Sequence, residues 1–420
     1  MEEASQPSSP GVSPVKLSDC MEHLLHLILS SSLNDTLEID LGLSKSYCSN
    51  LLIPDPAHST NFNVSDGLVG VPPYPLYTRL ASALHHCISS GTFVRTSHAV
   101  VPFEEDGLLE ERKDGWNKLI LDKGNELVNM LKAVKFQLHV QEPFFSQLKA
   151  GVKTIEGRCA VGDYERIQSG DLLLFNKCLL LEVQDVERYT SFSAMLEAKS
   201  LERVLPGIKT IEQGRTPKPC SSYPSQIPMS VYLFSGAQIY HNFYAEEKEK
   251  LNGVVAICVT KLVSQPYITV ANIVSGLSYE GIANLLGLVH TVGTVGDALP
   301  PPISALLSSF LIPHKATVRG SSALSEGARA LAKHVNRASN GWWGSFDGND
   351  SNKNRLALGV ISHLVTHSSW INIHYIQPDG CILEIRVAEG YGARWSKDGS
   401  KFIGFVEPHM TDGHLKRWMH

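Results

Sequence analysis

The sequence predicts an α+β fold: a small barrel of strands, a helical part before it and a second small α+β unit after it. From about residue 135 to 261, short apolar stretches with strand-like alternation are separated by short helical stretches. Before them, apolar residues recur every three or four positions, which is typical of amphipathic helices. Beyond residue 313, two helical stretches are followed by three strand-like ones, an order typical of α+β units.

Turn-rich stretches divide the chain into five predicted parts. The first is Pro/Ser-rich at its start, and the run of three prolines at 300–302 marks a linker. The parts are residues 1–75, mostly irregular or disordered with one short helix; 76–133, a helical extension; 134–262, the barrel; 263–313, a helix and a Pro-rich linker; and 314–420, the C-terminal α+β domain.

Composition excludes several classes of protein. A chain of 420 residues is long enough for two or three domains. Its eight cysteines include no CxxC pair, which excludes a zinc ribbon and a disulfide framework. The first ten residues are acidic and Pro/Ser-rich, unlike a secretory signal, and the longest apolar runs are shorter than the ~20 residues of a membrane span. We expect reduced thiols, no membrane partner, and a location in the cytoplasm, the nucleus or both.

The charge balance limits the kind of nucleic-acid contact that we expect. The net charge is −5 and the isoelectric point is near 6.4, whereas a protein that coats nucleic acid is strongly basic. Residues 135–214 contain ten Lys/Arg and eleven Asp/Glu. This balance argues against binding along many phosphates and favours a pocket for one nucleotide.

A cluster of polar residues follows the pattern G-x-K-x-x-E-x-R. Glu156 and Arg158 share one face of an extended segment and can form a charge-assisted pair beside a cleft. Gly151 lets the chain turn out of the preceding helix, and Lys153 can then donate to a phosphate or a base carbonyl. The alternative is that Lys153 is solvated and that the Glu156–Arg158 pair only fixes a loop. Spacing alone leaves both interpretations open.

With its flanking residues, this pattern resembles the signature of the ASCH family, whose fold is a PUA-like β-barrel. The likeness includes Gln141 and Pro143 before the pattern, Gly-Asp at 162–163, Leu-Pro-Gly at 205–207 and residues 243–249. It implies a protein that binds RNA or a nucleotide ligand. Some members of the family are parts of transcriptional coactivators. The predicted nucleic-acid-binding residues are Gln141, Gly151, Lys153, Glu156 and Arg158.

Two other functions stay open. A bacterial branch of the family hydrolyses acetylated cytidine with a threonine three residues after the lysine, where this chain has Glu156. Thr154 is nearby, but in an extended segment it points with Glu156, away from an activating base on the lysine side. We therefore favour a non-enzymatic protein, with no catalytic residue, metal or cofactor assigned. The third alternative is an adaptor that docks on a larger complex through its N-terminal helices.

Residues 215–237 interrupt the likeness to the ASCH family. Related sequences run almost directly from Glu-Gln-Gly, at 212–214 here, into Gln-Ile-Tyr, at 238–240 here. The intervening segment is rich in Pro and Ser, which is typical of loops. We interpret it as an insertion on the surface without a function of its own.

The C-terminal unit is the more basic part, with thirteen Lys/Arg, nine Asp/Glu and eight histidines from residue 314 onward. If 370–377 and 381–387 form a hairpin, His374 lies on one face of the first strand. Glu384 and Arg386 then share one face of the second strand. A loop at 390–395 would supply Arg394. The predicted pocket, for a phosphate-bearing or nucleotide ligand, consists of Lys333, Arg337, His374, Arg394 and Trp395.

The alternative for this unit is a satisfied polar network, with Glu384, Glu407 and Asp412 neutralising the cations around core tryptophans. The elements G-Y-G-A-R-W at 390–395 and D-G-H at 412–414 resemble those of uncharacterised stand-alone proteins. This resemblance implies no activity. His409, Asp412 and His414 have the chemistry of metal ligands, but histidines are frequent near chain ends, and we predict no metal site.

Overall fold

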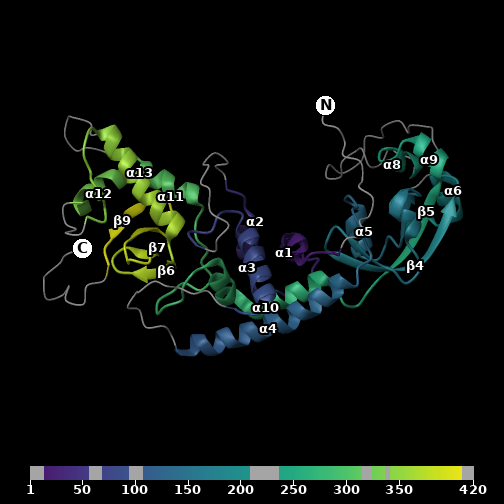
Figure 1. Cartoon of the computed structure of the whole chain (residues 1–420), viewed down its shortest axis with the longest axis horizontal. Helices are drawn as coiled ribbons and strands as arrows, with labels where there is room; N and C mark the ends of the chain where they lie inside the picture. The colour runs from purple at the N-terminus through teal and green to yellow at the C-terminus, as the bar shows by residue number, and fades with distance from the viewer. Residues whose placement is uncertain are drawn as a thin grey trace, which may run out of the picture. The chain divides into compact units, whose positions relative to one another are not determined.

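The computed structural model describes residues 14–55, 69–93, 107–208, 236–314, 324–335 and 341–408. It divides the chain into two compact units (Figure 1). Unit 1 comprises Met1–Leu24 and Glu126–Thr269, and unit 2 comprises Leu25–Asn125 and Val270–His420. Each unit contains helices and one sheet, so the predicted α+β class is confirmed.

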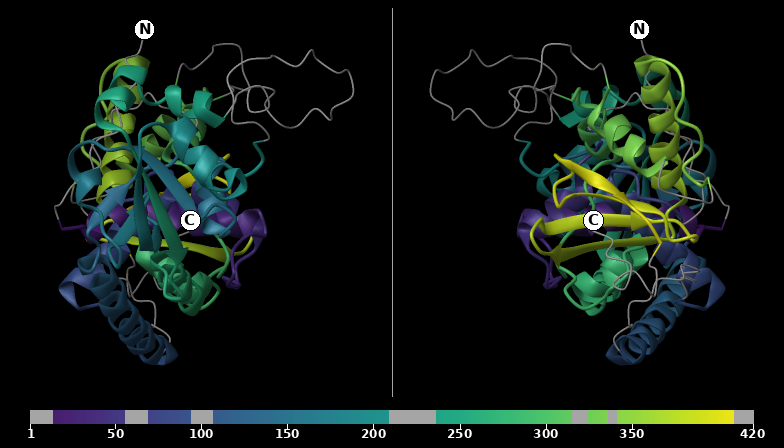
Figure 2. Two further views of the ribbon diagram at one scale, coloured as in Figure 1. Left: turned by 90° about the vertical axis from the view of Figure 1, so that its right-hand side faces the viewer. Right: turned by 90° about the vertical axis from the view of Figure 1, so that its left-hand side faces the viewer.

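The sheet of unit 1 is a curled half-barrel with the strand order β1-β3-β4-β5-β2 (Figure 2). β1 runs parallel to β3, and the other neighbours are antiparallel. The register of β4 shifts between Val183 and Asp185, and such a bulge bends a strand. The strands are β1 (Phe136–Leu138), β2 (Ile155–Cys159), β3 (Leu172–Phe175), β4 (Leu179–Tyr189) and β5 (Val254–Lys261).

Short helices connect these strands and cover the core of unit 1. α6 begins after Ser191, whose hydroxyl caps it by accepting from the Ala194 amide at 3.0 Å. Phe192 of α6 stacks on Tyr240 of α8 with ring centres 4.1 Å apart, and both belong to the buried core. The helices are α5 (Phe144–Lys149), the 3₁₀ helix η1 (Gly162–Arg166), α6 (Phe192–Ala198), α7 (Leu201–Val204), α8 (Gly236–His241) and α9 (Glu246–Asn252).

The predicted insertion at 215–237 lies outside the described residues except for its end. Gly236 and Ala237 begin α8, and both are buried. A Cβ on Gly236 would lie 2.9 Å from a methyl carbon of Leu196, so the glycine is closely packed. The end of the segment therefore packs into the core of unit 1 and is not part of a surface loop.

Helices account for the N-terminal half of unit 2. α1 (Leu17–Leu33), α4 (Gly107–Lys132) and α10 (Pro266–Leu286) each contain a boundary between the units, while α2 (Lys45–Leu52) and α3 (Leu76–Ser90) lie wholly in unit 2. The sequence predicted one short helix in an otherwise irregular or disordered stretch over 1–75, yet, in addition to α1, α2 forms there. Its Ser44 cap accepts from the Tyr47 amide, and the ring of Tyr47 packs edge-on against Tyr279 at 4.8 Å. This contact joins residues far apart in the chain, which a local pattern does not reveal.

The second sheet has the order β6-β7-β8-β9, and every neighbouring pair is antiparallel. α11, α12 and α13 lie on its apolar face (Figure 1, Figure 2). The elements are α11 (Ile303–Leu311), α12 (Glu326–Val335), α13 (Asp350–His367), β6 (Trp370–Ile376), β7 (Gly380–Arg386), β8 (Gly392–Ser396) and β9 (Phe402–Val406).

α11 belongs to this domain, although the sequence placed its residues in a linker. Phe310 is fully buried and packs edge-on against Phe402 of β9, with ring centres 5.0 Å apart. Leu306 is also fully buried, and its carbonyl accepts from the indole of Trp395 at 3.1 Å. The Pro-rich run therefore leads into core structure.

Among the described residues, we find no helix that combines the length and apolar composition needed to span a bilayer.

Candidate functional site

In unit 1, three of the predicted residues form one buried ionic cluster. β2 carries Glu156 and Arg158, and Lys153 lies two residues before the strand. The Lys153 ammonium is 3.1 Å from one carboxylate oxygen of Glu156, and Arg158 Nη2 is 2.9 Å from the other. All three residues are buried. The two cations thus converge on a single carboxylate.

The Lys153 side chain points into the protein. Its ammonium donates to the carbonyl oxygens of Ile155, at 2.8 Å, and Val204, in addition to its contact with Glu156. An ammonium has three donors, so these partners satisfy it. Burial lowers the pKa of Lys153, and the Glu156 carboxylate offsets this only in part. Lys153 therefore stabilises the cluster and has no donor left for a phosphate.

Arg158 is held more strongly in its charged form. Its Nη2 donates to the His139 carbonyl at 2.7 Å, and its Nη1 contacts the Tyr244 hydroxyl at 3.4 Å. Burial disfavours the charge, but the Glu156 carboxylate and the nearby tyrosines outweigh it, so the pKa of Arg158 lies above its ordinary value. Gly157, between the two ionic residues, fits closely: a Cβ there would lie 2.8 Å from the Tyr240 hydroxyl. The motif alone gave no reason for this glycine.

The remaining two predicted residues are exposed at the surface of unit 1. Gln141 and Gly151 are exposed, and Gly151, which follows the C-cap residue of α5, has a φ of 72°, a conformation that favours glycine. The side chain of Val152, the next residue, is 57% exposed. Gln141, Gly151 and Val152 are therefore open to a ligand, whereas Lys153, Glu156 and Arg158 are buried.

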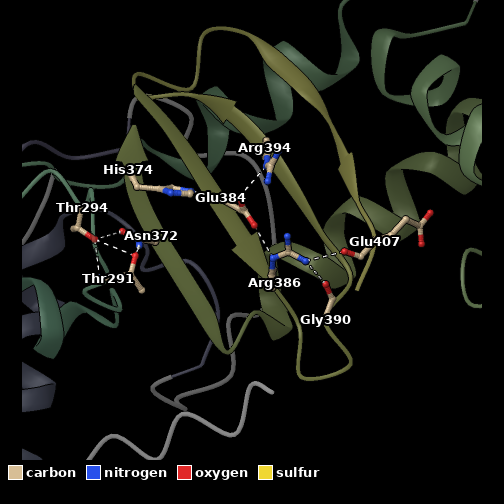
Figure 3. A network of polar contacts seen from close by, with 9 residues as sticks. All are labelled: Thr291, Thr294, Asn372, His374, Glu384, Arg386, Gly390, Arg394 and Glu407. Atoms are coloured by element: carbon tan, nitrogen blue, oxygen red, sulfur yellow. Dashed lines mark hydrogen bonds and ion pairs between the residues drawn. The ribbon is translucent and has the colours of Figure 1, made fainter. Parts of the chain in front are cut away.

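In unit 2, a second ionic cluster lies on the face of the sheet opposite the helices (Figure 3). Glu384 of β7 is at its centre and is completely buried. Its carboxylate accepts from Arg386 Nε at 2.6 Å and from Arg394 Nε of β8 at 2.8 Å. His374 Nε2 of β6 is 3.3 Å from the same carboxylate. Three adjacent strands therefore contribute to one site.

The two arginines differ in what they can still bind. Arg386 Nη1 donates to the carbonyl oxygens of Gly390, at 2.6 Å, and Glu407, at 2.9 Å, which fixes its guanidinium in place (Figure 3). The Glu407 carboxylate in turn contacts His334 at 2.7 Å. The side chain of Arg394 is 23% exposed, against 9% for Arg386. Arg394 is thus the arginine best placed to meet a ligand.

The edge of β6 next to this cluster is covered by residues 289–295. The amides of Val289 and Val295 donate to the carbonyls of Ile371 and Ile373, both at 2.8 Å. Asn372 is completely buried and bonds to the hydroxyls of Thr291, at 2.7 Å, and Thr294, at 3.0 Å (Figure 3). These bonds satisfy Asn372, so it supports the site next to His374.

The structure brings together two of the five residues predicted for the C-terminal pocket, His374 and Arg394. Trp395 lies on the other face, fully buried in the core against α11, because neighbouring residues of a strand point to opposite sides. The predicted loop at 390–395 is largely strand β8. Lys333 is exposed on α12, and Arg337 lies outside the described residues. Glu384 was assigned only to the competing network, yet it joins the two arginines and the histidine.

The metal-ligand trio considered at the chain end, His409, Asp412 and His414, also lies outside the described residues. Within the described ranges, we find no group of three or more His, Cys, Asp or Glu side chains arranged to hold a metal ion.

The pKa of Glu384 predicts a loss of stability in acid. Burial opposes ionisation, but His374, Arg386 and Arg394 outweigh it and lower the pKa from 4.5 to about 2. The folded value is depressed, so the stabilisation is complete above pH 4.5 and is lost as the pH falls towards 2. It amounts to about 3 kcal/mol. Acid titration of the tryptophan fluorescence should show this loss, and a Glu384→Gln variant should show a smaller pH dependence; equal curves would contradict the assignment.

Comparisons with known proteins match each unit separately. The family model for the ASCH domain matches residues 138–263, and that for the CdiA C-terminal tRNase toxin domain matches residues 313–407. No curated protein matches the chain. The first region contains the Lys153–Glu156–Arg158 cluster, and the second contains all four residues of the Glu384 cluster.

Two solved structures are also similar to part of the chain. The crystal structure of hypothetical protein PH0355 is 34% identical, with coverage of 30% of this chain and 97% of the other and a TM-score of 0.24. The solution NMR structure of protein PF0455 from Pyrococcus furiosus is 36% identical, with the same coverage and TM-score.

Proposed function

Because this chain belongs to the ASCH-domain family through residues 138–263, we propose that it is an RNA-binding protein whose C-terminal unit cleaves RNA. In this proposal, the exposed segment around Gln141 and Gly151 of unit 1 binds RNA, and the Glu384 cluster of unit 2 carries out the chemistry. The sequence favoured a non-enzymatic protein, and the geometry of the Glu384 cluster is the reason to propose an enzyme.

One observation carries the proposal. A histidine, a carboxylate and two arginines meet on one sheet face, with Glu384 bonded to the other three. These side chains lie within the region similar to a tRNase toxin domain. Hydrolytic enzymes that act on phosphodiesters need a proton acceptor and fixed positive charge where the phosphorane charge develops. His374 and the arginines have this chemistry.

In the proposed reaction, the RNA supplies its own nucleophile. His374 takes the proton of the ribose 2′-hydroxyl, whose oxygen attacks the adjacent phosphorus. The bond from phosphorus to the 5′ oxygen breaks, this oxygen takes a proton from water, and the His374 imidazolium returns its proton to the hydroxide that remains. The products are a 2′,3′-cyclic phosphate and a 5′-hydroxyl end. Arg394 contacts the phosphate, since it is the more exposed arginine, and a guanidinium matches phosphate oxygens in pairs.

Glu384 orients His374 in this scheme and is not itself the base. With a pKa of about 2, its carboxylate is a weak proton acceptor at neutral pH. Its bond to His374 Nε2 can hold the ring and stabilise the imidazolium that forms, as the carboxylate does in other proton-transfer dyads. Arg386, anchored on two backbone carbonyls, keeps Glu384 in place.

The hydrolysis of a modified nucleoside in unit 1 has weaker support. Glu156 is engaged by two buried cations, and Thr154 Oγ1 accepts from Arg203 Nε at 3.0 Å. Neither residue is next to a free base in the described structure, as an activated nucleophile requires. The coactivator-like role rests on the family resemblance alone, and the adaptor role rests on the N-terminal helices alone.

The dependence on a 2′-hydroxyl gives the test. The full-length protein should cleave tRNA, and the fragments should carry 2′,3′-cyclic phosphates by mass spectrometry. Substrates with 2′-deoxyribose at the cleaved positions should be resistant, because the nucleophile is missing. Cleavage of the deoxy substrates at an equal rate, or intact tRNA after prolonged incubation, would refute the proposal.

An Arg394→Ala variant distinguishes a site from a structural network. If Arg394 contacts the phosphate, the variant should lose cleavage per folded molecule, while Arg386 still pairs with Glu384 and keeps the unit folded. A loss of several kcal/mol of stability with unchanged activity per folded molecule would instead identify a structural network.

A further inference from the structure

Two histidines on α13 lie side by side at the surface. His363 and His367 are four residues apart, and both are exposed. Their ring centres are 4.4 Å apart, with an angle of 27° between the planes. They are separate from the Glu384 cluster, and the proposed RNA cleavage does not use them.

We propose that His363 and His367 form a binding site for a divalent transition-metal ion, with Zn²⁺ as the expected ligand. Histidines at positions i and i+4 lie on the same helix face, which is how metalloprotease helices present two ligands to zinc. A zinc–imidazole bond is about 2.0–2.1 Å long. Rings that are already 4.4 Å apart can bring one nitrogen each to a common ion by small side-chain rotations.

The hydrogen bonds around His367 prepare one ring nitrogen for a metal. The Thr366 hydroxyl donates to the Ser362 carbonyl at 2.8 Å, so its oxygen is available to accept. His367 Nδ1 is 2.8 Å from that oxygen and 3.1 Å from the His363 carbonyl. Both partners are acceptors, so Nδ1 carries the proton and Nε2 keeps its lone pair. A metal-binding histidine normally has its second nitrogen engaged in this way.

The Glu389 carboxylate interacts electrostatically with His363. Glu389 is exposed on the loop between β7 and β8, where an acidic side chain adds to the attraction for a cation. Water would complete the coordination of an ion held by two protein ligands.

The test is calorimetric titration of the full-length protein with zinc chloride. The wild-type protein should bind one more equivalent of zinc than the His363→Ala/His367→Ala double variant. Each single variant should lose about tenfold or more in affinity at this site, since even outer partners of a metal ligand contribute about 10–100-fold.

A matched control removes two histidines that cannot share an ion. His85 and His86 are neighbours on α3, and adjacent residues of a helix do not face each other. The His85→Ala/His86→Ala variant should therefore bind as many zinc ions as the wild type. Equal zinc binding by the wild type and the 363/367 variant would overturn the proposal, as would an equal loss in both double variants. Circular dichroism checks folding, and His363→Gln/His367→Gln replaces the alanine pair if that pair unfolds.

Discussion

Replacing His374 with Gln is expected to slow tRNA cleavage by the full-length protein by about 10²–10⁴-fold, the usual contribution of general acid–base catalysis. Glutamine can still donate a hydrogen bond towards the Glu384 carboxylate, which His374 approaches at 3.3 Å. It cannot take the proton of the 2′-hydroxyl. The loss should therefore fall on kcat, measured from initial rates over a range of tRNA concentrations, with little change in KM.

The control for this variant lies in the same hairpin. Asp379 is exposed in the turn between β6 and β7, so Asp379→Asn should leave both kcat and KM unchanged. A His374→Gln variant that cleaves tRNA as fast as the wild type would show that His374 transfers no proton. The proposed reaction would then have to be abandoned, because the Glu384 carboxylate is too weak a base to replace it.

Replacing Glu156 with Gln is expected to destabilise unit 1 by about 3–5 kcal/mol, the usual cost of removing one partner from a buried ion pair. The variant leaves Lys153 and Arg158 buried side by side without a counter-charge. Hydrogen exchange followed by mass spectrometry can measure the loss locally. The amides of β2 and β5, which pair with each other, should exchange faster.

Glu165→Gln is the matched control in the same unit. Glu165 pairs with Arg188 at 3.3 Å, but its side chain is 47% exposed, and an exposed pair contributes only about 0–1 kcal/mol. Its exchange pattern should resemble that of the wild type. If Glu156→Gln costs less than about 1 kcal/mol, the cluster is solvated in solution, and Lys153 would again be available to a ligand.

The sequence was sufficient for much of the fold. Apolar periodicity predicted the strands of the first sheet and α13, because burial of one face leaves a regular pattern in the chain. It failed where the burial is decided by distant partners. α2 forms within a Ser-rich stretch because Tyr47 packs on Tyr279, and α11 lies in the C-terminal core although three prolines precede it.

The sequence by itself also showed two groups of ionic residues: the G-x-K-x-x-E-x-R pattern, and Glu384 with Arg386 on one strand face. Only the tertiary structure decided which partners these residues have. The Val204 carbonyl, 51 positions beyond Lys153, takes part in turning that lysine inward. The register between β7 and β8 sets Arg394 beside Glu384 and directs Trp395 to the opposite face. A local pattern specifies side-chain alternation, whereas partners across strands depend on register and on contacts between distant segments.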